Sequence, residues 1–266
     1  MPELHHQGSS SDILSTNSGA CGQDNSVTSL ASSFKGKVKI EEKHGHNNEN
    51  QPDQKKEVKV EIGGKTKSTG GKNSKKNQPS ANMDLIQREI TRAKEGAKQR
   101  LNFQKTNMTS LPASIKDVLT LTELYLKSNR LTTLPNEIGC LTNLTTLALN
   151  ENVIISLPES MANLQKLNIL DLRHNRLTEI PNAVYQLQNL VTLYLRFNRI
   201  REVGEDIGNL SRLATFNMRE NNISSLPGSI GKLERLEALD LSYNQLDHLP
   251  PELGQCRKLN SIDVQQ

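Results

Sequence analysis

An asparagine returns at a fixed interval of 23 residues between residues 129 and 244 of this 266-residue chain. The six positions are Asn129, Asn152, Asn175, Asn198, Asn221 and Asn244. The same apolar pattern, LxxLxLxxNxL, surrounds each of them, as in the stretch from Leu167 to Leu177. A unit this short cannot bury its leucines alone, so the copies must stack and each must cover its neighbours.

Each residue type in the unit has a structural reason. The paired leucines, such as Leu170 and Leu172, predict a short strand with alternate side chains turned inward. The asparagine follows at the turn, where its amide can both donate and accept hydrogen bonds with buried backbone groups. A Leu-Pro or Ile-Pro pair then ends strand pairing, because proline has no N–H, and a short helical turn returns the chain. One unit differs, because Val203-Gly204 stands where Leu-Pro is expected.

This pattern resembles the leucine-rich repeat. It predicts an α/β leucine-rich repeat solenoid, or horseshoe, with a parallel concave sheet and the asparagine ladder inside. We assign the repeats to residues 121–266, where the last copy ends within a strand, so we expect a truncated solenoid.

A capping region is predicted over residues 82–120. Helical spacing over residues 82–99 places four apolar residues on one face, with Asn82 as the expected N-cap. The four residues are Ile86, Ile90, Ala93 and Ala97. A degenerate first repeat follows, with Thr106 where asparagine belongs. Helix and degenerate repeat together would cover the open edge of the sheet.

Residues 1–81 contain almost no apolar periodicity, so we expect a disordered, lysine-rich leader. Between Lys55 and Lys76, eight lysines face two glutamates. Such a tail can be attracted to an anionic membrane surface or to nucleic acid. We favour a solvated linker and expect no nucleic-acid partner, because the stretch has neither arginine nor an aromatic residue between its lysines.

Cysteine content and hydropathy indicate the cellular compartment. The three cysteines, Cys21, Cys140 and Cys256, are far apart, whereas secreted proteins of this repeat type usually have disulfide-bonded caps. The first residues lack the apolar run of a signal peptide, and no later stretch predicts a transmembrane segment. We therefore expect a cytoplasmic protein, with the nucleus as an additional location.

Chemical catalysis is not predicted. The histidines have no cysteine or carboxylate partners at metal-ligand spacing, so we expect no metal and no cofactor. No nucleophile, base and orienting group stand apart from the repeat pattern, so we expect no enzyme.

The side chains between the leucines should face solvent on the concave sheet. Two positions before each asparagine, the residues are Lys127, Asn150, Arg173, Arg196, Arg219, Ser242 and Gln265. Four positions before, they are Tyr125, Ala148, Asp171, Tyr194, Asn217, Asp240 and Asp263. Three arginines would thus occupy adjacent strands about 4.8 Å apart.

Arginine and tyrosine beside carboxylates are typical of a protein-recognition surface. We predict eight partner contacts on this face: Tyr125, Lys127, Asp171, Arg173, Tyr194, Arg196, Arg219 and Asp240. The alternative is an ordinary polar face on which Arg173 pairs with Asp171. That alternative explains single charges better than it explains three arginines in one column.

Three stretches closely resemble a known family: LTELYLKSNRLTTLPNEIGCLTNLTTLALNEN, LDLRHNRLTEIP and LYLRFNRI. The family is the Shoc-two (Sur-eight) leucine-rich repeat scaffold of the Ras/MAP kinase pathway, and the resemblance covers residues 82–266. It implies an M-Ras-type small GTPase and the type 1 protein phosphatase catalytic subunit as partners, with membrane contact only through the GTPase. Raf kinase is a further implied partner, because the phosphatase removes an inhibitory phosphate from it.

The resemblance also directs attention to the leader. Partners of this phosphatase dock a basic residue followed by Val-x-Phe, or a close variant, as an added strand. Lys59, Val60 and Ile62 form the predicted docking motif, and Lys37-Val38-Lys39-Ile40 is a second near match. Both have isoleucine where an aromatic residue is preferred, which would weaken binding by about 1 to 2 kcal/mol. The alternative is a chance pattern in a disordered tail.

A second family is the alternative for the whole chain. Scribble-like or Erbin-like adaptors, and plant Ras-group adaptors, have similar repeats without phosphatase targeting. Scribble-like chains begin their repeats near the N-terminus, so the long lysine-rich leader favours the Shoc-two resemblance.

Overall fold

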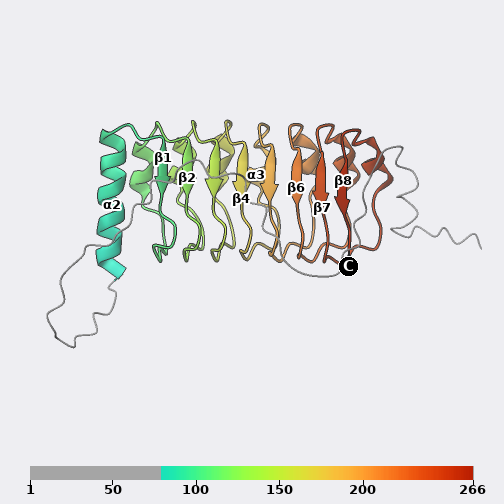
Figure 1. Cartoon of the computed structure of the whole chain (residues 1–266), viewed down its shortest axis with the longest axis horizontal. Helices are drawn as coiled ribbons and strands as arrows, with labels where there is room; N and C mark the ends of the chain where they lie inside the picture. The colour runs from blue at the N-terminus through green and yellow to red at the C-terminus, as the bar shows by residue number, and fades with distance from the viewer. Residues whose placement is uncertain (1–78, 266) are drawn as a thin grey trace, which may run out of the picture.

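The computed structural model describes residues 79–265, and eight short parallel strands run through this part in chain order. Their bounds are β1 Arg100–Asn102, β2 Glu123–Tyr125, β3 Thr146–Ala148, β4 Ile169–Asp171, β5 Thr192–Tyr194, β6 Thr215–Asn217, β7 Ala238–Asp240 and β8 Ser261–Asp263. The strands lie side by side along an elongated stack (Figure 1). The predicted leucine-rich repeat solenoid with a parallel sheet is therefore confirmed.

Short helical segments return the chain between successive strands. Six are 3-10 turns and one is a short α-helix: η2 Ala113–Asp117, η3 Asn136–Cys140, η4 Glu159–Asn163, α3 Asn182–Tyr185, η5 Glu205–Asn209, η6 Gly228–Lys232 and η7 Pro251–Gln255. A proline in extended conformation precedes each of them except η5, which follows Gly204. Proline thus stands where strand pairing has ended and the helical turn begins, as its missing N–H requires.

The core is a column of identical positions. Each strand buries its middle residue: Leu101, Leu124, Leu147, Leu170, Leu193, Phe216, Leu239 and Ile262. Strand pairing is in register by whole repeats, so Leu124 pairs with Leu147 and Leu147 with Leu170. Any position of the repeat therefore forms a row across the sheet, which is how a sequence column becomes a surface.

Five of the six ladder asparagines are buried, Asn244 is half-buried, and each binds three backbone groups. Nδ2 of Asn175 donates to the carbonyls of Leu149 and Leu172, both at 3.0 Å, and Oδ1 accepts the N–H of Ile154 at 3.0 Å. Each asparagine therefore joins its own repeat to the preceding one. The same three bonds recur at the other ladder positions, so the predicted internal ladder is present.

A left-handed residue precedes every ladder asparagine. The six residues have φ between 53° and 58° although none is glycine: Ser128, Glu151, His174, Phe197, Glu220 and Tyr243. This conformation costs a non-glycine residue roughly 1 to 2 kcal/mol. The asparagine amide bonds across the left-handed residue. Nδ2 of Asn175 donates to the carbonyl of Arg173 at 3.2 Å, and His174 lies between the two residues in the chain. The amide thus helps to hold the turn in this conformation.

The altered repeat has a matching change in its neighbour. Tyr185 stands where other repeats have Gly139, Ala162, Gly208, Gly231 or Gly254. A side chain is excluded at Gly231, since its Cβ would lie 2.5 Å from the carbonyl oxygen of Glu252. Tyr185 is buried, and its hydroxyl accepts the N–H of Gly204 at 2.8 Å. Proline at 204 could not donate this bond, which explains why Val203-Gly204 replaces Leu-Pro.

A helix, α2 (Pro79–Glu95), covers the first edge of the stack (Figure 1). Ile86, Ile90 and Ala93 are buried against the core. Two predicted details are wrong. Asn82 lies inside the helix rather than at its N-cap, and its amide donates to the carbonyl of Thr106. The helix ends at Glu95, so Ala97, with φ of 46°, is exposed beyond it instead of sharing the apolar face.

Thr106 continues the ladder in reduced form. Its hydroxyl lies 3.0 Å from the carbonyl of Phe103 and 2.9 Å from Oδ1 of Asn129, so it can donate to either. The carbonyl three residues earlier is also what a ladder asparagine binds. The predicted disordered leader extended to residue 81, but residues 79–81 belong to α2, so that boundary is wrong. The rest of the leader, with the docking motif Lys59, Val60 and Ile62, lies outside the described residues.

Replacing a ladder asparagine should destabilise the fold. Asn175→Leu leaves buried backbone groups of two repeats without partners, at about 1 to 3 kcal/mol for each group. Thermal denaturation followed by circular dichroism should show a clear loss of Tm. Asn222→Leu is the matched control, because Asn222 is exposed and lies one residue from the ladder. Similar melting of the two variants would contradict the role of the ladder.

The bond between Tyr185 and Gly204 should appear as coupling in a double-mutant cycle. Tyr185→Phe leaves the N–H of Gly204 without its acceptor and should cost about 1 kcal/mol. Gly204→Pro should be costly in the native background, since it removes the donor and puts Cβ 3.1 Å from the tyrosine hydroxyl. In the Tyr185→Phe background the proline should cost less, because the donor is already unpaired. Equal costs in both backgrounds, measured by urea denaturation, would exclude this coupling.

Candidate functional site

Strand pairing places the predicted tyrosine and aspartate column in one continuous row. Tyr125 pairs with Ala148, Ala148 with Asp171, and Asp171 with Tyr194. The row continues through Asn217, Asp240 and Asp263. These residues end their strands, so their side chains alternate with the buried middle residues and lie on the outer face of the sheet.

The predicted arginine column lies two residues further along each repeat. The N–H of His174 donates to the carbonyl of Arg196 at 2.9 Å, and that of Phe197 donates to the carbonyl of Arg219 at 3.0 Å. Consecutive turns therefore remain paired where the arginines leave the sheet. The side chains of Arg173, Arg196 and Arg219 are 41%, 38% and 27% exposed, so each can still reach a partner.

Arg173 is held by two neighbours. Its guanidinium makes two bonds to Asp171, with Nη2 at 2.8 Å from Oδ2 and Nε at 3.0 Å from Oδ1. The guanidinium carbon also lies 5.1 Å from the centroid of the Tyr194 ring. The hydrogen bonds to Asp171 raise the pKa of Arg173. The pairing considered in the alternative to a binding face is therefore present, and it fixes the orientation of this arginine.

Arg196 and Arg219 share one acid that sequence reasoning missed. Oε1 of Glu220 lies 3.5 Å from Nη2 of Arg196 and 3.1 Å from Nε of Arg219. A single carboxylate thus reduces the repulsion between two neighbouring cations. Nε of Arg196 is buried and has no hydrogen-bond partner within residues 79–265. This donor is therefore left unsatisfied within the described part of the chain, at a cost in free energy.

Aromatic rings that the sequence analysis did not select lie against the same arginines. Arg196 lies 4.5 Å from the ring centroid of Phe197, and Arg219 lies 4.4 Å from that of Tyr243. Phe197 also stacks on His174, with 4.3 Å between ring centroids. Burial, followed by the charge of Arg196, lowers the pKa of His174 below its usual range, so this imidazole is neutral at neutral pH.

The missed residues share one signal in the sequence. His174, Phe197, Glu220 and Tyr243 each stand directly before a ladder asparagine. The strand pattern alone does not predict where these side chains point, because the left-handed turn changes the direction of the chain there. The position before the asparagine is therefore a third column of the face.

The remaining predicted contacts fall into separate groups. Asp240 accepts from Nδ2 of Asn217 at 2.9 Å and from the hydroxyl of Ser242 at 2.6 Å, next to Arg219. Nearer the N-terminal cap, Lys127 pairs with Glu151 at 3.1 Å. The hydroxyl of Tyr125 donates to Glu123 at 2.9 Å, and burial raises its pKa. Tyr125 and Lys127 thus belong to a different part of the face from the three arginines.

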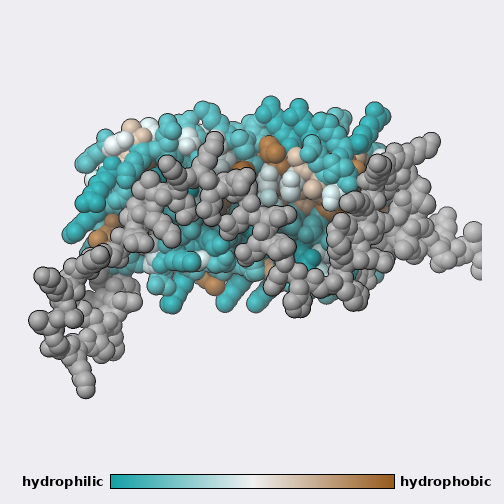
Figure 2. Space-filling view, viewed as in Figure 1, coloured by the Kyte–Doolittle hydropathy of each residue, from teal (hydrophilic) through white to brown (hydrophobic). Residues whose placement is uncertain are grey.

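The surface visible in Figure 2 is mostly hydrophilic, with separate apolar spots rather than one broad apolar area. Binding through charged and aromatic side chains fits such a surface better than binding through one large hydrophobic patch.

Of the cysteines, Cys256 is buried, and burial raises its pKa to about 11, so it is not an activated nucleophile. Within residues 79–265 no helix has the length and hydropathy needed to cross a membrane.

Models of the family described as leucine rich repeat match residues 120–141, 142–200 and 188–246. A leucine-rich repeat protein soc-2 homolog from Nematostella vectensis is 44% identical over 89 residues, which are 33% of this chain and 15% of that protein. The soc-2 homolog of Drosophila erecta is 40% identical over 88 residues, which are 33% of this chain and 14% of that protein. The matched stretch is therefore a small part of each relative.

A solved structure shows the same architecture. A leucine-rich repeat protein of Leptospira interrogans is 32% identical, with a TM-score of 0.54 over 62% of this chain and 48% of that one. The soc-2 relatives confirm the resemblance to the Shoc-two scaffold that the repeats predicted. Residues 120–246 thus match models of the leucine-rich repeat family, and the chain resembles the soc-2 homologs.

Proposed function

We propose that this chain is a non-catalytic, protein-binding scaffold of the Ras/MAP kinase pathway. It recruits an M-Ras-type small GTPase and the type 1 protein phosphatase catalytic subunit, and thereby promotes dephosphorylation of Raf kinase. It acts in the cytoplasm, with the nucleus as a second location, and reaches the membrane only through the GTPase. The soc-2 relatives support a scaffold role, and the finer assignment rests on the resemblance of the repeats.

One observation carries the binding role. The three arginines of adjacent repeats are each held by a carboxylate and lie against an aromatic ring. Arginine has many rotamers, and fixing one costs conformational entropy, so a side chain that is already fixed loses less on binding. Arginine and aromatic residues are the types that contribute most of the binding energy at protein interfaces, and this row contains both.

The chemistry of this row defines the partner surface it fits. The accessible N–H groups of the three half-exposed guanidinium groups require carboxylates or carbonyl oxygens opposite them. The rings of Tyr194, Phe197 and Tyr243 offer apolar area between the charges. A folded protein surface with acidic residues around an apolar centre satisfies both needs, and we assign the GTPase to this face.

Reversing the arginine row should abolish GTPase capture. A variant with Arg173→Glu, Arg196→Glu and Arg219→Glu should bind the GTPase, loaded with a non-hydrolysable GTP analogue, at least about a hundredfold more weakly, which corresponds to about 2.7 kcal/mol. Loss of oriented charges and repulsion of acidic partner groups both contribute. Binding would be measured by calorimetry on the full chain.

The control has the same change of charge elsewhere. Arg212→Glu, Arg235→Glu and Arg257→Glu alter three exposed arginines outside this row. This control should retain GTPase binding, and circular dichroism should show both triple variants folded. Unchanged affinity in the first variant, with the fold intact, would remove the arginine row from the binding site.

Phosphatase binding should depend on the leader motif. A peptide of residues 54–68 should bind the catalytic subunit, and the Val60→Ala, Ile62→Ala variant should bind clearly more weakly, because the two apolar side chains fill its pockets. A peptide of residues 32–46, with Val38 and Ile40, tests whether any V-x-I pattern suffices. Equal binding by the native and double-variant peptides would show that this segment is not the anchor.

A further inference from the structure

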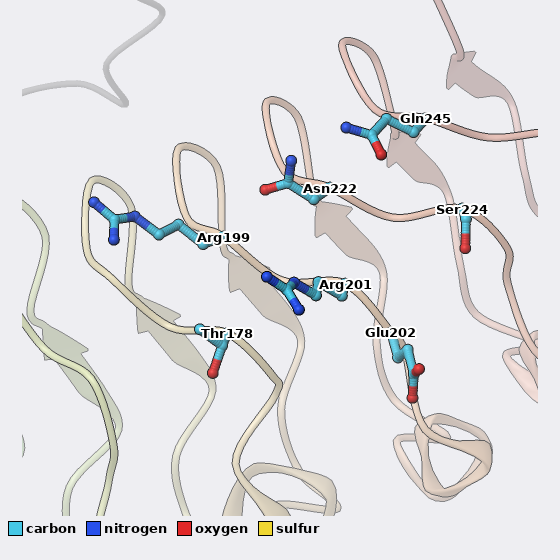
Figure 3. A pocket seen from close by; sticks show the side chains of 7 residues that line it. All are labelled: Thr178, Arg199, Arg201, Glu202, Asn222, Ser224 and Gln245. Carbon is cyan, nitrogen blue, oxygen red and sulfur yellow. The ribbon is translucent and has the colours of Figure 1, made fainter.

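An open groove lies beyond the turns that follow β4 to β7, apart from the arginine row. Its volume is about 700 Å³, and it is lined by Thr178, Arg199, Arg201, Glu202, Asn222, Ser224 and Gln245. All seven residues are exposed, and they come from four successive repeats. Figure 3 shows their side chains on the segments that follow the turns, with those of Arg199 and Arg201 extended in a similar direction.

Backbone pairing is incomplete along this groove. At the first residue after each ladder asparagine, a backbone hydrogen bond joins every pair of neighbouring repeats. The N–H of Arg199 donates to the carbonyl of Leu177 at 2.8 Å, and the N–H of Asn222 donates to the carbonyl of Ile200 at 2.8 Å. Two residues later, such a bond joins only every second pair of the described repeats. Arg201 donates to Thr178 at 3.2 Å, but among the described residues no backbone hydrogen bond joins Ser224 to Arg201. The carbonyl of Arg201 and the N–H of Ser224 therefore have no backbone hydrogen-bond partner among the described residues.

The side chains in the groove differ from those of the arginine row in one respect. Arg173, Arg196 and Arg219 are paired with acids, whereas Arg199 and Arg201 form no ion pair within residues 79–265. Asn222, Ser224 and Gln245 likewise have no side-chain hydrogen bond to another described residue. The groove thus combines two free cations with a set of unused neutral donors and acceptors.

We propose that this groove is a second docking site, which binds an extended acidic segment of a partner protein. Carboxylates of the segment pair with Arg199 and Arg201, while its backbone bonds to the free carbonyl of Arg201 and the free N–H of Ser224. The lysine-rich leader of this chain carries the wrong charge to be the occupant. The assignment does not depend on the identity of the partner at the arginine row.

Two features favour an acidic peptide over nucleic acid. None of the seven lining residues is aromatic, so the groove offers no platform on which bases could stack. Glu202 is the one acid among them, and a phosphate backbone with a charge at every nucleotide would have to pass it. A peptide can place a neutral residue beside Glu202 and still present carboxylates to the two arginines.

The test uses the full chain and a fluorescein-labelled hexaglutamate peptide, with binding measured by fluorescence anisotropy near physiological ionic strength. Arg199→Glu with Arg201→Glu should weaken binding at least about tenfold, since two attractive charges become repulsive. Ser224→Phe should also weaken it, because the added ring fills the groove without changing the charge. Thermal denaturation of each variant checks that the fold is retained.

The matched control is Arg130→Glu with Arg257→Glu. Both residues are exposed, and Arg130 occupies in an earlier repeat the position that Arg199 has in its own. This control should bind the peptide as the native chain does. Equal loss in both double variants would mean general charge attraction, and unchanged binding in the groove variants would place the peptide elsewhere. Either result overturns the proposal, as does tighter binding of single-stranded RNA that the same groove variant abolishes.

Discussion

The buried asparagine amide is the interaction on which the rest of the structure depends. At each repeat the chain leaves the sheet through a left-handed residue, which directs backbone carbonyls and an N–H of two successive repeats into the interior. Buried polar groups of this kind must find partners, and one amide supplies both donors and an acceptor. The turn, the stacking and the spacing of repeats therefore depend on a single side chain.

Regular spacing is what turns separate residues into a surface. Because repeats pair in register, residues 23 apart become neighbours at the distance between strands. Repetition of arginine at one position brings like charges together, which costs free energy unless acids are placed between them. Asp171 and Glu220 meet that requirement, and Tyr194, Phe197 and Tyr243 lie against the guanidinium groups. The same contacts that relieve the repulsion also fix the arginines in position.

Departures from the repeat are as informative as the repeat itself. Tyr185 stands at a position where other repeats have small residues. Its hydroxyl accepts a hydrogen bond from the N–H of Gly204, which stands where other repeats have proline. The groove begins just before this glycine, at Arg199 and Arg201, where backbone pairing between neighbouring segments is incomplete. The same bond is absent between Thr178 and Ile155, so incomplete pairing recurs along the described stack. The segments beyond the turns thus offer a second kind of surface.

The sequence by itself determined the repeat length, the strand positions, the ladder and the two columns of the sheet, because each follows from the periodicity of apolar residues and asparagine. It also placed the buried face of the cap from Ile86 to Ala93, since helical spacing is local. Periodicity could not give the position of Asn82, whose amide bonds to the carbonyl of Thr106, distant in sequence. The end of the cap helix was also missed, because it depends on the left-handed residue Ala97.

Only the tertiary structure decided which side chains meet around the arginines. Glu220, Phe197 and Tyr243 join the face because a left-handed residue changes the direction of the chain before each asparagine, and a strand pattern does not include that change. The groove likewise depends on which backbone groups of adjacent repeats pair, and nearly identical repeats can differ in this. Local periodicity determines the rows, whereas contacts between rows depend on how the turns pack.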